Sequence, residues 1–257
     1  MAGRALWKAY FNFDGTEVPV KFHTAVRDLR LHFNLLHRKD GERLKQMMVC
    51  PVEEAPVPDE EIVKGYELSD DEWVIVEPDE LEALAPEFDR EIEILDFVPL
   101  DSIDPRYFSR SYWIGPDGKG EVYSSLAKAL EKSGQAAICR WAMRKKSYIG
   151  ALKIVGGVLL METMHYHDEV VPVKALELSQ TGISDRERKT AVQLIEAMST
   201  DFKPENYQNE YQEELRKLID KKAKGEKITL KKPKKKKATE EEDLADVLEA
   251  SLAQVKK

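Results

Sequence analysis

Short runs of alternating hydrophobic and polar residues dominate the first hundred positions, and they predict β-strands rather than helices. Residues 6–13 mix aromatic with polar side chains, and Asp14-Gly15 supplies a tight turn before residues 18–26 return around Val20. The chain therefore begins with a hairpin. We predict further strands over residues 30–36, 73–76 (buried) and 91–98, an acidic loop over 53–61, and a short helix over 78–84 that begins with proline.

A helix is predicted to interrupt the strands in the middle of the chain. Leu126, Ala127 and Leu130 share one face of a helix over residues 123–134, and Gly134 suits the position just after a helix C-terminus. Three successive strands are then predicted over residues 136–141, 148–154 and 158–164.

The hydrophobic period becomes helical from about residue 184. Ser184 and Glu187 form a capping box ahead of an apolar stripe, and Pro204 is expected to begin a second helix. A second capping box, at Thr239–Glu242, precedes a terminal amphipathic segment. We therefore divide the chain into a β-rich body over residues 1–200, a helical arm over 201–225, a flexible basic linker over 226–238 and a terminal amphipathic helix over 239–257.

The formal net charge of −8 hides an uneven distribution. Residues 1–100 hold 23 acidic and 11 basic residues, whereas residues 221–237 hold ten lysines against one acid, Glu226. This asymmetry indicates a basic interaction tail on an acidic body. An acidic body can still bind DNA if its basic residues line one surface.

Composition restricts the class of protein. Hydrophobic residues make up 42% of the 257 positions, which is enough to build a buried core. No apolar run reaches the roughly 18 residues of a membrane span, and the N-terminus lacks the apolar run of a secretory signal. Cys50 and Cys139 are too few for a disulfide framework. We therefore expect no membrane association and a cytoplasmic, reducing location.

The chain lacks the motifs of common catalytic sites, namely a phosphate-binding loop, a dinucleotide fingerprint and a nucleophile elbow. One enzymatic alternative is a metal site, because strand alternation would place His165 and His167 on one face with Asp168 beside them. The simpler interpretation is a strand end with two partly exposed histidines. Cys50 has no cysteine nearby and is interpreted as a buried thiol. We expect no catalytic residue, no metal and no cofactor.

Basic residues gather in two segments of the body and in the tail. No helix carries side chains at a base-reading spacing, so these residues suit contacts with phosphates rather than sequence readout. A weaker alternative is that the tail alone attracts anionic partners in general. The candidate DNA-binding residues are Arg30, His37, Arg38, Lys39, Arg43, Lys45, Arg140, Arg144, Lys145, Lys146 and Lys153, with Lys231, Lys232, Lys234, Lys235, Lys236 and Lys237 in the tail.

Several collinear segments resemble one known family. They are Val18-Pro19-Val20-Lys21, the run from Phe33 to Gly41, the run from Glu61 to Glu67, Glu93–Leu100, Ile103–Phe108, and Phe202-Lys203-Pro204-Glu205 continuing to Gly225. Together they are similar to the prokaryotic Ku family over essentially the whole chain. The terminal run Leu244–Leu252 resembles the short C-terminal motif of many members.

The resemblance implies an α+β fold, with a seven-stranded β-barrel core, an extended loop arm and a helical C-terminal arm. It also implies that two copies form a homodimeric ring that threads onto double-stranded DNA ends without sequence specificity. Such a protein is not an enzyme; it starts non-homologous end joining, recruits an ATP-dependent multifunctional DNA ligase, and would be associated with the nucleoid. Some members carry a Cys-x-x-Cys pair, whereas Cys50-Pro51-Val52-Glu53 lacks the second cysteine, which argues against zinc here.

The terminal segment has an acidic start and an apolar stripe, so it is expected to contact protein rather than DNA. The candidate partner-binding residues are Leu244, Val247, Leu248 and Leu252. Two hypotheses remain open, namely that this helix docks on a partner such as the ligase, or that it folds back onto its own core.

Overall fold

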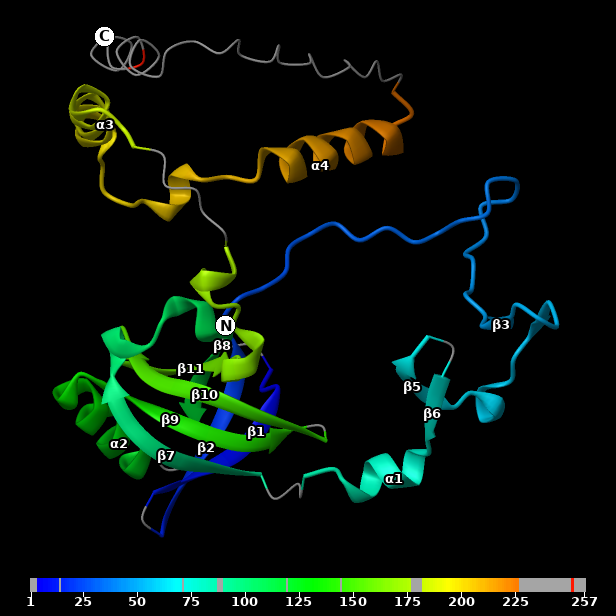
Figure 1. Ribbon diagram of the computed structural model, residues 1–257, viewed down its shortest axis with the longest axis horizontal. Coiled ribbons are helices and arrows are strands. Elements are labelled where there is room, and N and C mark those ends of the chain that lie inside the picture. The colour runs from blue at the N-terminus through cyan, green and yellow to red at the C-terminus, as the bar shows by residue number, and fades with distance from the viewer. Residues whose placement is uncertain are drawn as a thin grey trace. The chain divides into compact units, whose positions relative to one another are not determined.

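A closed barrel of seven strands forms the core of the described chain (Figure 1). The computed structural model describes residues 4–13, 15–70, 72–86, 90–118, 120–143, 145–176, 182–226 and 251. The barrel strands are β1 (Trp7–Phe13), β2 (Thr16–Thr24), β7 (Glu91–Pro99), β8 (Phe108–Pro116), β9 (Gln135–Met143), β10 (Lys146–Val155) and β11 (Val158–Met164). The expected α+β fold with a seven-stranded barrel is confirmed.

The barrel closes through one parallel pair of strands. The strand order is β1-β2-β8-β11-β10-β9-β7, and residues 10–12 of β1 pair in parallel with residues 91–93 of β7. The other neighbouring pairs of the barrel are antiparallel. The Asn12 side-chain amide donates to the Glu91 carboxylate across this seam at 2.6 Å. Closure pairs the two strands that would otherwise be the exposed edges of the sheet.

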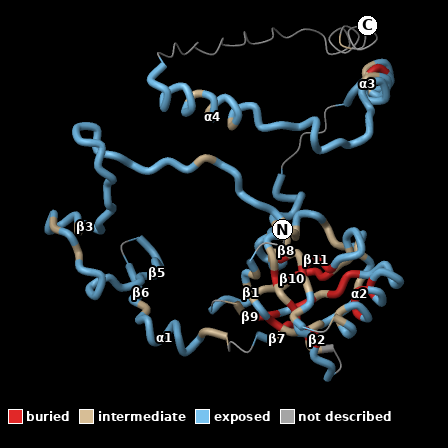
Figure 2. The backbone as a smooth tube through the Cα atoms, turned by 180° about the vertical axis from the view of Figure 1, so that it is seen from behind, coloured by how far each residue is buried: buried red, intermediate tan, exposed pale blue. Residues whose placement is uncertain are grey.

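The barrel interior is filled by alternate residues of its strands. On β2, Val18, Val20 and Phe22 are buried while Pro19 and Lys21 between them are not. This alternation is the period of a pleated strand, and Figure 2 shows that the buried residues concentrate in the barrel and on the helix beside it. The alternation around Val20 therefore predicted correctly which face of β2 is internal.

Helix α2 (Glu121–Ser133) packs across the end of the barrel where β2 and β9 begin. Its Leu126, Ala127 and Leu130 are buried in the core, as the helical stripe predicted. Gly134 follows the helix with a φ of 67°, a left-handed conformation that glycine adopts without a steric cost.

The segment between β2 and β7 contains little regular structure. Its elements are β3 (Val49–Cys50), β4 (Ala55–Pro56), β5 (Lys64–Ser69), β6 (Glu72–Val76) and α1 (Pro78–Ala83). Strand β3 pairs with β4, and β5 pairs with β6, in two separate two-stranded sheets. We call residues 25–77 the loop arm. The expected extended loop arm is therefore present as irregular chain with two small hairpins.

Three sequence-based predictions fail in the loop arm. Residues 30–36 form no strand, because only a single bridge joins Leu36 to Arg43 and no neighbouring strand pairs with the rest. Residues 73–76 do lie in a strand, but β6 pairs with β5 alone, so Trp73 is 57% exposed rather than buried. Cys50 is only half-buried, because its strand, β3, pairs with β4 in a separate two-stranded sheet.

By compactness the chain divides into two units, Met1–Val173 and Lys174–Lys257. The second unit contains α3 (Asp185–Met198) and α4 (Glu210–Ala223). Ser184 caps α3 through the predicted box, because its Oγ accepts the Glu187 N–H at 3.3 Å. Pro204, by contrast, begins only a single 3₁₀ turn; the second helix begins later, at Glu210, where the Asn209 side chain accepts the Gln212 N–H.

The predicted linker, residues 226–238, and the terminal helix, residues 239–257, lie outside the described residues except at 226 and 251. Among the described helices none is long and apolar enough to cross a membrane.

Candidate nucleic-acid interface

The first basic segment lies in the loop arm and turns sharply at residues 37–42. The His37 N–H donates to the Glu42 carbonyl at 2.8 Å and the Gly41 N–H to the His37 carbonyl at 2.8 Å. His37 Nδ1 lies 2.7 Å from the Asp40 carboxylate, and this contact lowers the pKa of Asp40. The turn therefore engages His37 internally and is held in one conformation by its own hydrogen bonds.

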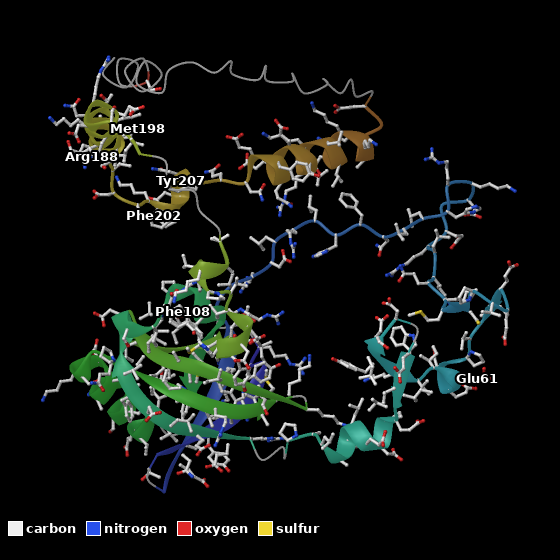
Figure 3. All side chains as sticks on the ribbon, viewed as in Figure 1. Glu61, Phe108, Arg188, Met198, Phe202 and Tyr207 are labelled. Atoms are coloured by element: carbon white, nitrogen blue, oxygen red, sulfur yellow. The ribbon has the colours of Figure 1, made fainter. Side chains whose placement is uncertain are left out.

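The turn and its flanks present four cations to solvent. Arg38, Lys39, Arg43 and Lys45 are exposed, and no ion pair involves them in the part of the chain that the structure describes. Figure 3 shows the side chains of this segment standing free along its length. A cation without a carboxylate partner can contact a phosphate without first breaking an ion pair. These four candidate DNA-binding residues, like the exposed Lys146 at the start of β10, need break no described ion pair to contact a phosphate.

Arg30, at the start of the same segment, is engaged by its neighbour. Its Nε and Nη2 donate to the Asp28 carboxylate at 2.9 and 2.6 Å. The bidentate guanidinium holds the pKa of Asp28 well below its usual range. A phosphate would therefore have to compete with Asp28 for Arg30, whose side chain is 75% exposed.

The second basic segment lies at the turn between β9 and β10, where two cations are already paired. Arg140 donates to Glu93 on β7 at 2.7 Å, and Lys145 donates to Glu82 of α1 at 2.6 Å. The Lys145 contact lowers the pKa of Glu82. The side chains of both pairs are at least half exposed, so the pairs are weak and a phosphate can compete for the cations. Arg144 lies outside the described residues.

Lys153 lies in a different environment from the other candidates. It pairs with Glu162 on the adjacent strand β11, with 18% and 15% of the two side chains exposed. The ammonium also lies 4.9 Å from the centroid of the Phe108 ring, and Ser111 Oγ donates to the same carboxylate at 3.1 Å. This network joins β8, β10 and β11, so Lys153 is paired within the sheet, unlike the four cations of the loop arm.

The histidines of the metal alternative do not share a face. Strand β11 ends at Met164, and His167 begins a 3₁₀ turn, so the alternation that would align His165 with His167 is lost. His165 Nδ1 lies 3.6 Å from Glu169, whereas His167 Nδ1 lies 3.2 Å from the Tyr107 hydroxyl. No cluster of three or more potential metal ligands occurs among the described residues. The expected juxtaposition of His165, His167 and Asp168 is therefore wrong.

Large apolar side chains are exposed along the same arm that carries the cations. Phe33 and Met47 are each 68% exposed, and Leu35 and Met48 are exposed to a similar extent. In the second unit Phe202 and Tyr207, labelled in Figure 3, stack on one another with centroids 5.6 Å apart yet remain exposed. Monomeric proteins rarely leave this much apolar surface in solvent. These segments are therefore suited to contact with another chain.

Sequence reasoning did not include Arg110, a basic residue of the barrel without a described ion-pair partner. It lies on β8, a strand whose residues, FSRSYWIGP, show no clean alternation and were assigned to no element. The tail candidates Lys231, Lys232, Lys234, Lys235, Lys236 and Lys237 lie outside the described residues, as do Leu244, Val247, Leu248 and Leu252.

Comparison with known proteins identifies relatives along the whole chain. The family model described as the Ku70/Ku80 beta-barrel domain matches residues 12–195, more than half of the chain. The protein named "Non-homologous end joining protein Ku 2" of Geotalea uraniireducens (strain Rf4) is 45% identical over 255 residues, which cover 99% of this chain and 100% of that protein. The protein named "Non-homologous end joining protein Ku" of Anaeromyxobacter sp. (strain K) is 39% identical over 254 residues, covering 97% and 85%. That of Solibacter usitatus (strain Ellin6076) is 34% identical over 232 residues, covering 90% and 87%.

Proposed function

Because the chain belongs to the Ku family, we propose that it is a non-enzymatic DNA-end-binding protein of non-homologous end joining. In this proposal two copies form a ring that threads onto a linear double-stranded end and then recruits an ATP-dependent multifunctional DNA ligase. The observation that carries the proposal is the loop arm, since its exposed cations and its exposed apolar side chains lie on one continuous segment.

The cations account for binding without sequence readout. Lysine and arginine contacts with phosphates supply affinity that does not depend on the bases, and base readout needs an element that enters a groove. The arm turn offers Arg38, Lys39, Arg43 and Lys45 for such contacts, while Arg140, Lys145 and Lys146 supply a second set near the β9–β10 turn. The excess of acidic residues elsewhere would disfavour loose binding outside the ring.

The apolar side chains account for the dimer. Phe33, Leu35, Met47 and Met48 would be buried if the arm packed against a second copy, and such burial contributes about 25 cal/mol for each Å² removed from water. A dimer in which two arms meet would enclose a space. Cations around that space that contact only phosphates would hold a duplex of any sequence that entered it.

The ring is tested by comparing DNA of identical sequence as a linear duplex and as a covalently closed circle in a gel shift. We expect the linear form to bind and the circle to bind far more weakly, because a closed ring can load only over an end. Linearising the circle with a restriction enzyme should restore binding. Equal affinity for both forms would refute the ring, even if phosphate-directed binding itself remained.

The tail is proposed to have two roles. The lysines of residues 231–237 would add affinity for nearby phosphates without end specificity, and Leu244, Val247, Leu248 and Leu252 would dock on the ligase. Deleting residues 238–257 should leave end binding intact but lower stimulation of the cognate ligase, and Leu248→Asp with Leu252→Asp should reproduce that loss. A lowered melting temperature with normal ligase stimulation would instead favour docking on the chain's own core. A protein with these roles would act in the cytoplasm, on the nucleoid.

A further inference from the structure

The barrel end opposite α2 is lined by residues that include two cations. Lys146 lies on the same face of β10 as the buried Leu152, whereas Arg110 lies on β8 at the irregularity in its pairing with β11, between Phe108 and Ser111. Both residues line a cavity of about 700 Å³ at this end, which we call the barrel mouth. Its volume lies within the range of small-molecule sites, roughly 300–1,000 Å³.

Aromatic rings form much of the remaining wall of the barrel mouth. Phe22 is 2% exposed, and Trp7 contacts it edge-on with centroids 5.1 Å apart. Tyr148 stacks on Trp141 at 5.5 Å with an interplanar angle of 14°. Trp7, Phe22 and Tyr148 line the cavity whereas Trp141 does not, so Trp141 supports the Tyr148 ring from outside it. The wall therefore presents the partly exposed rings of Trp7 and Tyr148, which pack against the buried rings of Phe22 and Trp141.

The charge of the barrel mouth is positive. The exposed side chains of Arg110 and Lys146 line the same cavity, and within the described residues no ion pair involves either of them. The acidic residue that lines it, Glu169, is already engaged: its carboxylate accepts the Tyr166 N–H at 2.7 Å and lies 3.6 Å from His165 Nδ1. Two cations without a carboxylate partner thus face a space walled by aromatic rings.

We propose that the barrel mouth binds a 5′-nucleotide, with the base against the aromatic wall and the phosphate held by Arg110 and Lys146. A ligand with a flat ring and an anionic group matches both features of the cavity, because bases stack on aromatic side chains and guanidinium and ammonium groups bind phosphate. The same chemistry is presented by a free mononucleotide and by the last nucleotide of a single-stranded DNA overhang. Lys146 also belongs to the second set of cations proposed to contact the duplex, so Arg110 and the aromatic wall are the part of this site that is separate from duplex-end binding.

The test uses isothermal titration of the full chain with dAMP, with deoxyadenosine and with inorganic phosphate. We expect dAMP to bind, and each of its two halves to bind roughly tenfold or more weakly, because each lacks one of the two contacts. Arg110→Gln with Lys146→Gln should lower the affinity for dAMP to that for deoxyadenosine. Lys128→Gln, an exposed cation on α2 at the other end of the barrel, removes one positive charge and should change nothing.

Two further measurements identify the ligand and separate this site from end binding. A short 5′-phosphorylated single strand that displaces dAMP identifies an overhang as a ligand, whereas failure to displace it identifies the free nucleotide. Arg110→Gln should leave the affinity for a blunt duplex unchanged, and unchanged melting temperatures would show that the variants fold. The proposal is overturned if dAMP shows no saturable binding at millimolar concentration, if the double variant binds it normally, or if inorganic phosphate binds as tightly as dAMP.

Discussion

Cations that are unpaired in the free protein should contribute more to DNA binding than cations already held by carboxylates. Three double variants each remove two positive charges: Arg38→Gln with Lys39→Gln in the arm turn, Arg140→Gln with Lys145→Gln at the β9–β10 turn, and Lys128→Gln with Lys132→Gln on α2. The arm pair has no described carboxylate partner, whereas Arg140 and Lys145 lie 2.7 and 2.6 Å from theirs. Because all three variants lose the same charge, any difference between their DNA affinities reports the position of the cations rather than the net charge of the protein.

The expected magnitude follows from counterion release. Each phosphate contact contributes about 0.9 to the slope of log K against log salt, so losing two contacts flattens the slope by about 1.8 for each protomer. Over a fourfold rise in salt this corresponds to about a twelvefold smaller loss of affinity than in the unmodified protein. The β9–β10 variant should flatten the slope less, because a phosphate must displace Glu93 or Glu82 before it gains the cation. The α2 variant should leave the slope unchanged.

The assay is a fluorescence-anisotropy titration of a labelled blunt duplex at several salt concentrations, repeated on a second duplex of unrelated sequence. All three variants should keep the melting temperature of the unmodified protein, because exposed ion pairs contribute only about 0–1 kcal/mol to stability. Equal slope changes in all three variants would show that net charge alone matters. An unchanged slope in the arm variant would remove the arm turn from the DNA interface.

Three further outcomes test the structure. Lys153→Met should lower the free energy of unfolding by roughly 2–4 kcal/mol in a denaturant titration, because Glu162 is left mostly buried without its cation. The slope of log K against log salt for DNA binding should stay the same. Normal stability with a flattened slope would instead make Lys153 a DNA contact. Gly150→Ala should destabilise by more than about 2 kcal/mol in the same titration, because a Cβ there would lie 2.6 Å from the Glu162 carbonyl oxygen; a stable variant would contradict this packing. In the native protein a thiol reagent should modify Cys50 at a lower pH than it modifies free cysteine, since backbone hydrogen bonds lower the pKa of Cys50. Burial raises the pKa of Cys139 and should keep it unmodified until denaturant is added; two native thiols reacting alike would refute that burial.

Local patterns in the sequence were sufficient to predict much of the secondary structure. Val158–Met164 was predicted with its observed bounds, Ser184 caps α3 as its capping box indicated, and the stripe on α2 is buried as expected. These features depend on residues within a few positions of one another, so the sequence alone contains the information that produces them. The family resemblance then supplied the barrel itself.

Only the tertiary structure decided which of these segments pair with a neighbouring strand. Residues 30–36 have the composition of a strand, but hydrogen bonding needs a neighbour and only Leu36 has one. Conversely, β8 shows no clean alternation, yet it becomes a strand because β2 and β11 pair with it on both sides. Strand pairing joins residues that are distant in sequence, and no local period records that choice.

The same distinction applies to the basic residues. The sequence identified the cations but could not show that Lys153 pairs with Glu162 inside the sheet, or that Arg110 lies at the barrel mouth with Lys146. Whether a cation is free to contact a phosphate depends on which carboxylate lies within about 4 Å of it. Arg30 pairs with a close neighbour in sequence, Asp28, whereas the pairing of Lys153 with Glu162 is fixed by strand register. The sequence gives the charge of each residue, whereas the fold brings carboxylates from distant segments next to a cation such as Lys153 and so decides whether it is free to contact a phosphate.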